Sequence, residues 1–425
     1  MTTFVMIICA VLALCFLVFI HEAGHFLASR AFGVRVTELM LGLPGPSIGF
    51  TKGSTRYGVT AVLLGGYARV CGMEAGEMSP HLRDALAALY RRGTATMEDV
   101  AADCGITDDE AYAALEELVE WGSCSGPTKA DQFNMYRAPE ARPTGKQLRA
   151  ARAAHPAGVV DPSLAVRPAA AAAGSAAADG SAPASAPASA LVDAPSPAPA
   201  AASSAPAPAP APALASYALG EPRPVNDPQA LFDREYAQQY RSLPFWKRSI
   251  ILLAGPFVNL LFTMVAFVVI YSVVGIDLRY ADTGEVFHFN ATPLQSIQMG
   301  FAYIGMVVQA VAGLFNPATA AQTVESSASI VGIVAMSGDF FEKGFVDSLF
   351  FMAMISVSLG IMNLLPIPPL DGGRFAVEVF QKLTRKTVPT KVMGYLTIAG
   401  MVLFLGFFAI MLSQDVQRLF TGFYS

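Results

Sequence analysis

Long apolar runs separated by short polar segments dominate the chain. A spanning helix needs about 20 mainly apolar residues, and four runs meet this length: residues 4–30, 250–274, 347–365 and 391–412. A fifth run, residues 299–315, is broken by glycines and barely long enough to cross. The first run lacks a basic leader and a small-residue cleavage site, so we expect it to remain as a span.

A different periodicity follows the first run. Apolar and polar residues alternate over short stretches of 34–70, which predicts strands. The phase of the alternation reverses near Thr37 and Glu38, where we expect a bulge. Leu64, Gly65, Gly66 and Tyr67 fit a kinked edge strand with free backbone groups, although spacing alone also allows an ordinary glycine turn.

Helical spacing returns between residues 81 and 121. Thr96 is expected to begin a short helix that Gly105 ends, and Thr107 with Glu110 forms a capping box for a third helix. Three short helices with a glycine turn resemble a winged-helix module. The third helix has six acidic residues and no Lys or Arg, so a protein-interaction module is favoured and no nucleic acid is expected.

Composition supports a membrane protein joined to a low-complexity segment. The mean hydropathy is +0.46 and only 14% of residues are charged. The formal net charge of −5 gives no basic field for nucleic acid. Residues 138–216 are rich in Ala, Pro and Ser and predict a disordered linker. The five cysteines show no CxxC spacing, so they are interpreted as small apolar residues.

The distribution of basic residues predicts the orientation. Lys and Arg gather after the first span, before the second and between the third and fourth, whereas residues 275–344 are mostly acidic. The positive-inside rule then places both termini outside and the insert in the cytoplasm. With four crossings in this orientation, Asp371 lies on the same side of the membrane as the polar end of the first span. A further crossing by residues 299–315 would move Asp371 to the other side, so these residues are expected to form a surface or re-entrant helix.

That polar end carries the candidate chemistry. His21 and His25, four residues apart on one helix face, can bind one Zn²⁺, and Glu22 can serve as general base. A chance match is the alternative, but ionisable residues within membrane helices are costly and indicate function. A third ligand is needed, and Asp371 is the candidate because it follows a proline-broken helix end beside Gly372 and Gly373. The alternative is a helix-terminal Asp in a glycine turn.

These motifs together resemble the site-2 protease family of intramembrane zinc metalloproteases, and most of all its bacterial regulator-of-sigma-E type. The resemblance covers residues 1–75 and 240–415. It rests on four motifs, at residues 21–25, 64–67, 255–259 and 363–373. It implies zinc ligands His21, His25 and Asp371, the base Glu22, and substrate contacts at Gly65, Gly66, Tyr67 and Asn363. The relatives carry PDZ domains between the second and third spans, and residues 275–292 are too few to form one.

The predicted fold is a polytopic α-helical membrane protein with four transmembrane helices, a membrane-associated β region and a small cytoplasmic helical, winged-helix-like insert. Its expected parts are the first span with the motif (1–33), the β region (34–78), the insert (79–137), the linker (138–216), an interfacial helix with the second span (217–274), an extracytoplasmic segment (275–344) and the last two spans (345–425).

The predicted function is regulated proteolysis in the inner cell membrane. The expected substrate is a single-span regulatory protein, such as an anti-sigma-factor-like regulator, and the insert has a possible cytoplasmic protein partner. The alternative is a catalytically idle receptor or scaffold whose insert binds a partner, although such a protein need not keep Glu22. A metal transporter is less favoured, because the second and fourth spans offer no ligands.

Overall fold

The computed structural model describes residues 3–63, 65–73, 78–128, 131, 133–141, 216–279, 285–326, 330–386 and 388–420. The chain divides into two compact units. One unit contains Met1–Pro139 together with Pro222–Ser425, and the other contains Glu140–Glu221. In the second unit, Ala141 and Tyr217 form an antiparallel bridge. The predicted linker falls mostly on residues 142–215, which lie outside the described residues.

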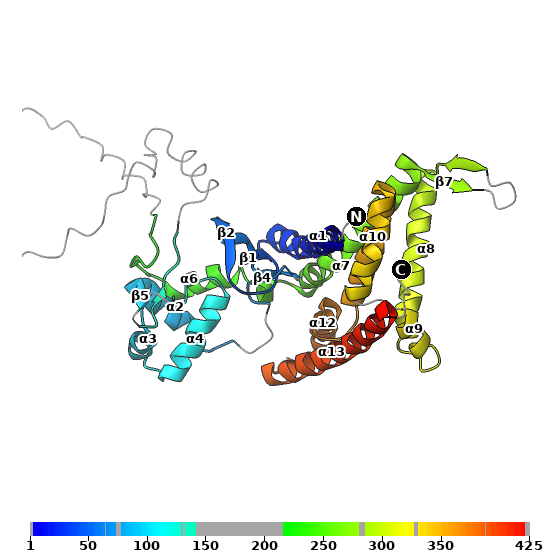
Figure 1. The fold of residues 1–425 in the computed structure, drawn as a ribbon. Coiled ribbons are helices and arrows are strands. Elements are labelled where there is room, and N and C mark those ends of the chain that lie inside the picture. Colours follow the sequence, from blue (N-terminus) through cyan, green and yellow to red (C-terminus); the bar gives the residue numbers. More distant parts are fainter. Residues whose placement is uncertain are drawn as a thin grey trace, which may run out of the picture. The chain divides into compact units, whose positions relative to one another are not determined.

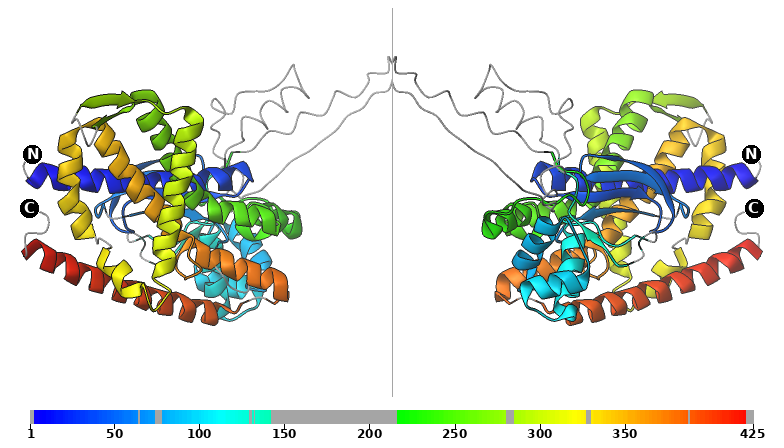
Figure 2. Two further views of the ribbon diagram at one scale, coloured as in Figure 1. Left: turned by 90° about the vertical axis from the view of Figure 1, so that its right-hand side faces the viewer. Right: turned by 90° about the vertical axis from the view of Figure 1, so that its left-hand side faces the viewer.

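Helices form where the apolar runs predicted them (Figure 1). The four predicted spans are α1 (Thr3–Ala31), α7 (Phe245–Val268, continued by the π-turn η2, Val269–Val274), α11 (Phe345–Asn363) and α13 (Thr390–Phe420). Figure 2 shows the long α13 in two further views. Helix α1 packs closely on α7, where a Cβ atom added to Gly24 would lie 2.6 Å from the Ala254 carbonyl oxygen.

A fifth helix among the described residues is also long and apolar enough to cross a membrane. This helix is α8 (Pro293–Gly313), which begins at a capping box formed by Thr292 and Gln295. The sequence predicts a surface or re-entrant helix for residues 299–315, and the predicted count of four spans is not confirmed. Two shorter helices, α9 (Ala320–Ser326) and α10 (Ile330–Lys343), connect α8 to α11.

A four-stranded sheet follows α1 in the chain. Its order is β2-β3-β1-β4, from β1 (Val36–Leu41), β2 (Ser47–Lys52), β3 (Thr55–Thr60) and β4 (Gly66–Val70). The register between β1 and β4 shifts between Val36 and Glu38, which confirms the predicted bulge. Strand β4 lies at the edge of the sheet, as predicted for Gly66 and Tyr67, whereas Leu64 lies outside the described residues.

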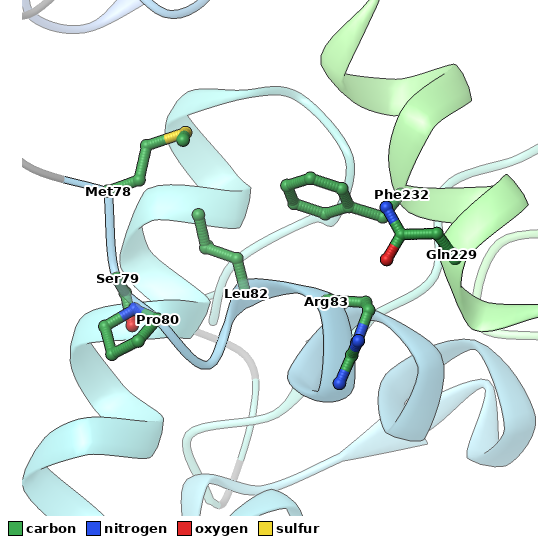
Figure 3. A pocket seen from close by; sticks show the side chains of 7 residues that line it. All are labelled: Met78, Ser79, Pro80, Leu82, Arg83, Gln229 and Phe232. Carbon is green, nitrogen blue, oxygen red and sulfur yellow. The ribbon is translucent and has the colours of Figure 1, made fainter.

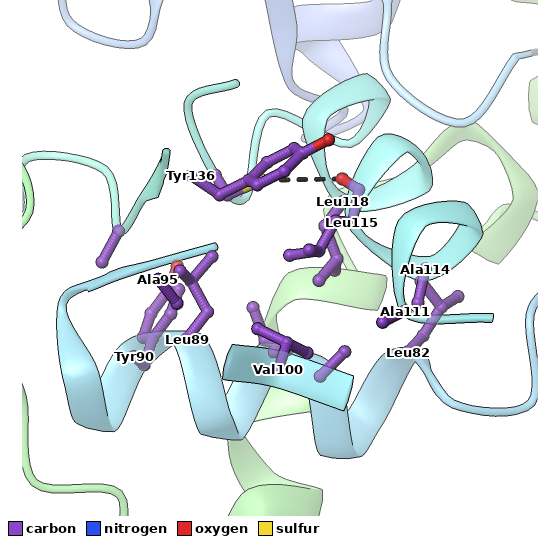
Figure 4. Packing of buried hydrophobic residues seen from close by; sticks show 14 of the residues in the cluster. Leu82, Leu89, Tyr90, Ala95, Val100, Ala111, Ala114, Leu115, Leu118 and Tyr136 are labelled. Atoms are coloured by element: carbon purple, nitrogen blue, oxygen red, sulfur yellow. Dashed lines mark hydrogen bonds between the residues drawn. The ribbon is translucent and has the colours of Figure 1, made fainter. Parts of the chain in front are cut away.

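The insert is a small helical module with its own apolar core (Figure 4). Both predicted caps are present, at Thr96 and Thr107, and Gly105 ends the second helix in a left-handed conformation. The module contains α2 (Leu82–Arg92), α3 (Met97–Cys104), α4 (Asp108–Glu120) and a short ladder of β5 (Thr94–Ala95) with β6 (Tyr136–Arg137). The module thus contains three short helices and a small ladder, and its assignment as winged-helix-like stays a prediction.

The interfacial helix expected before the second span is α6 (Pro228–Tyr236), which packs Phe232 and Tyr236 against Trp121 of the insert. A short 3₁₀ turn, η1 (Tyr240–Ser242), then leads into α7. The sequence analysis did not identify the hairpin of β7 (Ile276–Arg279) with β8 (Val286–Phe289), or the helix α12 (Asp371–Thr384).

Candidate metal centre

The two histidines of α1 face α7 from inside the protein. His21 and His25 are 5% and 6% exposed, and they follow one another on the same helix face, as their spacing predicts. The backbone of α7 comes close to both rings at Gly255. A Cβ atom there would collide with Nε2 of either histidine, so only glycine leaves this space open.

Asp371 reaches the same place from the other end of the chain. It is the first residue of α12, where the chain folds back after the proline-rich turn. A Cβ atom at Gly372 or Gly373 would collide with backbone atoms of Leu364 or Pro368, so the two glycines permit this fold. The Oδ2 atom of Asp371 lies 3.0 Å from His21 Nε2 and 3.2 Å from His25 Nε2. The predicted third ligand is therefore beside the other two.

The position of Asp371 bears on how many times the chain crosses the membrane between α1 and α12. Asp371 lies beside the histidines, so the chain between α1 and α12 must return to the same depth. If α8 crosses the membrane, α9 and α10 must supply the return, and α10 with 14 residues is roughly 21 Å long, shorter than a spanning helix. The position of Asp371 therefore does not confirm a crossing by α8.

The donor set fits a metal ion. His25 Nδ1 lies 2.8 Å from the carbonyl oxygen of Ile251, which can only accept, so Nδ1 carries the proton and Nε2 presents a lone pair. The two Nε2 atoms are 3.3 Å apart. A carboxylate oxygen and two imidazole nitrogens meet here, and a cation satisfies all three. Tetrahedral zinc with bonds of about 2.0–2.1 Å separates its ligand atoms by about 3.3 Å, close to the separations observed.

Asn259 lies beside the histidines, and sequence reasoning included it in a family motif without giving it a role. Its side chain is 0% exposed, and its amide nitrogen lies 3.2 Å from His21 Nδ1. Its Oδ1 has no hydrogen-bond partner within the described part of the chain. With the amide turned by 180°, Oδ1 accepts a hydrogen bond from His21 Nδ1–H, and His21 Nε2 is left free for a metal. A lone Asn inside an apolar span was the available signal.

Glu22 is held by the edge of the sheet. Its Oε2 accepts a hydrogen bond of 2.9 Å from the backbone N–H of Ala68. Ala68 is opposite Leu39, three positions from the pair Gly42 and Gly65, which is hydrogen-bonded across the strands. Hydrogen-bonded and non-bonded pairs alternate along an antiparallel ladder, so the backbone N–H and C=O of Ala68 point to the outer edge of the sheet. The predicted base therefore sits between the histidines and the edge strand.

The predicted substrate residues take different positions. Gly65 has a φ of 104°, which favours glycine, and it precedes β4. A Cβ atom on Gly66 would lie 3.4 Å from Glu22 Cγ, so this strand passes close to the base. Tyr67 is the next residue of the strand. Asn363 lies at the end of α11, where its amide donates to the carbonyl oxygen of Leu359.

A separate hollow lies on the insert. It has a volume of about 350 Å³, and its lining includes Leu82, Arg83, Gln229 and Phe232 (Figure 3). Its lining contains no metal-ligating side chain of the centre, so it is distinct from the triad.

Relatives with assigned names match part of the chain. Three bacterial relatives each carry the name "Putative zinc metalloprotease". They are from Streptococcus pneumoniae (37% identity over 90 residues, 21% of this chain and 22% of the relative), Clostridium perfringens (34% over 127 residues, 29% and 38%) and Lactococcus lactis (29% over 123 residues, 29% of each). The chain thus aligns with well under half the length of these relatives.

The family profile covers far more. The profile of peptidase family M50 matches residues 9–407, which include α1 with its two histidines, α7 with Asn259 and the start of α12 with Asp371. Members of this family are membrane-embedded and zinc-dependent, so zinc is the metal that the donor set takes. The chain belongs to peptidase family M50, the site-2 protease family.

Proposed function

We propose that this chain is a zinc endopeptidase that hydrolyses peptide bonds within or near transmembrane segments of membrane-bound regulatory proteins. The observation that carries the proposal is the meeting of His21, His25 and Asp371 on membrane-length helices, with Glu22 beside them. Family membership and the names of the relatives support peptidase chemistry. The inner cell membrane, with both termini outside and the insert in the cytoplasm, is part of the proposal.

Each residue of the site has its own role in the proposed hydrolysis. His21, His25 and Asp371 would hold the zinc ion, which supplies an acidified water and polarises the scissile carbonyl. The Glu22 carboxylate takes the proton of the attacking water and returns it to the leaving amine. Ala68 N–H holds Glu22 in reach before substrate arrives.

The edge strand can bind a substrate helix that has unwound in the bilayer. A helix in lipid hides its carbonyl groups in its own hydrogen bonds, so a substrate must unwind before it is cut. The outer edge of β4, where the Ala68 N–H already holds Glu22, offers its other backbone groups to an unwound segment, and Gly66 leaves room for it. Asn363 is proposed as a further contact to the substrate backbone, and the substrate as a single-span protein.

The test uses the full chain in lipid vesicles with a panel of single-span membrane proteins. Zinc-loaded protein is expected to cut at least one of them, with the cut located inside or next to the span by mass spectrometry. Glu22→Gln should lower the rate by about 10²- to 10⁴-fold while zinc stays bound. Glu98→Gln, on α3 of the insert, is the matched control.

Equal cleavage by Glu22→Gln would remove Glu22 from the reaction. Absence of any cut across the panel by zinc-loaded protein would favour the alternative, a receptor whose cytoplasmic insert binds a protein partner. The intact base and complete ligand set count against that alternative, because binding alone requires neither.

A further inference from the structure

The side chain of Arg35 joins the insert to the four-stranded sheet. Arg35 lies between α1 and β1, and its side chain is only 12% exposed. The guanidinium donates to the carbonyl oxygen of Gly122 at 2.8 Å and to Gln238 Oε1 at 2.9 Å. It also forms an ion pair of 2.9 Å with Glu235. Arg35 therefore contacts both the end of α4 and the helix that follows the linker.

The insert side of this junction is equally closed. Glu235 on α6 has a side chain only 9% exposed and accepts a second hydrogen bond of 2.7 Å from Ser123 Oγ. The backbone turn at Gly122 lies directly on β1, since a Cβ atom there would approach Thr37 Cγ2 to 2.6 Å. A buried ion pair is costly to desolvate and adds little stability, so fixing one geometry is its better-founded role.

From Arg35 a short backbone path leads to the base. The Arg35 carbonyl oxygen accepts a hydrogen bond of 3.0 Å from Cys71 N, directly after β4. Strand β1 begins at the next residue, and Leu39 within it is opposite Ala68. Ala68 N–H in turn holds Glu22. The same residue thus anchors the start of β1 and the end of the strand that positions the carboxylate.

We infer that Arg35 is a positioning residue for Glu22, through which the insert fixes the edge strand β4 against α1. The inference rests on the proposed peptidase function. It gives the insert a role in the reaction itself. A well-packed insert keeps Gly122 and Glu235 in fixed positions, and Arg35, bound to both, fixes the position of the sheet. The Ala68 N–H then stays directed at the Glu22 carboxylate. A loosened junction leaves the zinc ligands in place and misplaces only Glu22.

The test compares Arg35→Met with Arg92→Met in the full chain. Arg92 forms an exposed ion pair with Asp103 inside the insert, so its loss removes an arginine pair without touching β1. Arg35→Met is expected to lower kcat by about 3- to 30-fold, with KM and zinc content unchanged. Hydrogen exchange of residues 66–70 should quicken. Arg92→Met should leave all four quantities as in the wild type.

A second variant separates positioning from folding. Arg35→Met with Glu235→Met replaces the buried pair by apolar side chains, which can restore stability. We expect its melting temperature to recover while kcat stays low, because the contact to Gly122 is still missing. Recovery of kcat along with stability would overturn the inference, as would wild-type kcat and exchange in Arg35→Met.

Failure of the proposed function gives a different pattern. If the wild type cuts nothing, the exchange of residues 66–70 still reports the junction: faster exchange in Arg35→Met alone supports the coupling without peptidase chemistry. Unchanged exchange in that case overturns the coupling as well.

Discussion

The metal centre and the core of the insert are built in opposite ways. The centre joins residues 350 positions apart, from His21 to Asp371, and crowds polar atoms together that only a cation satisfies. The insert core is assembled mainly from neighbouring short helices, and apolar side chains such as Leu86, Leu115 and Leu118 fill it without exposure. The centre brings polar atoms together for chemistry, whereas apolar packing stabilises the insert. Zinc binding and the stability of the insert should therefore respond to different substitutions.

The largest expected effect is the loss of zinc on removing a ligand. Asp371→Ala deletes the carboxylate that faces both Nε2 atoms, so a two-imidazole site remains. Bound zinc, measured by elemental analysis after dialysis, should fall from about one ion per chain to background. Asp347→Ala, at the first turn of α11, should keep its zinc. Equal zinc in both variants would contradict the assignment of Asp371.

The next effect belongs to the insert alone. Leu118 is 0% exposed in its core, so Leu118→Ala should lower the free energy of unfolding by about 2–5 kcal/mol. Fluorescence of Trp121 in a Trp246→Phe background reports this region. Tyr112→Ala, on the same helix but 51% exposed, should change little. Loss of zinc together with the insert's stability would show that the two regions are not held separately.

A smaller effect is expected one contact away from the metal. Asn259→Ala removes the group beside His21 Nδ1, which should lower zinc affinity about 10- to 100-fold. The comparison is Asn363→Ala, since that amide donates to its own helix. Competition with a chromogenic chelator measures both affinities. Identical values for the two variants would leave Asn259 as a packing residue.

The smallest effect concerns acid stability of the insert. Hydrogen bonds from Arg92 hold the pKa of Asp103 below its ordinary value. A lowered folded pKa contributes stability above the unfolded pKa of about 3.9, and that contribution is lost as pH falls through the folded value. The stability difference between wild type and Arg92→Met should therefore be present at pH 6 and shrink below pH 4. A difference independent of pH would argue against this pairing.

Much of this arrangement could be predicted from the sequence. The spacing of His21 and His25 requires one helix face, the glycines after Asp371 indicate close approach, and the Thr96 and Thr107 caps depend on residues three positions away. Such local rules also located the bulge near Glu38. The single-span substrate, the orientation and the role of Asn363 stay predictions.

Other features depend on distant contacts that no local pattern contains. Arg35 meets Gly122 and Glu235 only after folding, and a buried arginine has the same sequence appearance as an exposed one. Helix α12 was not predicted although Phe375, Val379 and Leu383 recur at helical spacing, because the proline-rich turn and the two glycines at its start were interpreted as a break. The strands of the β7–β8 hairpin have four residues each, too few for alternation to register.

The most direct test of the central claim is X-ray absorption spectroscopy of the zinc-loaded full chain. The ligand set described here predicts one zinc site with two imidazole nitrogens and additional oxygen ligands only, and loss of one imidazole in His25→Ala. A sulfur ligand, or an unchanged spectrum in His25→Ala, would contradict it.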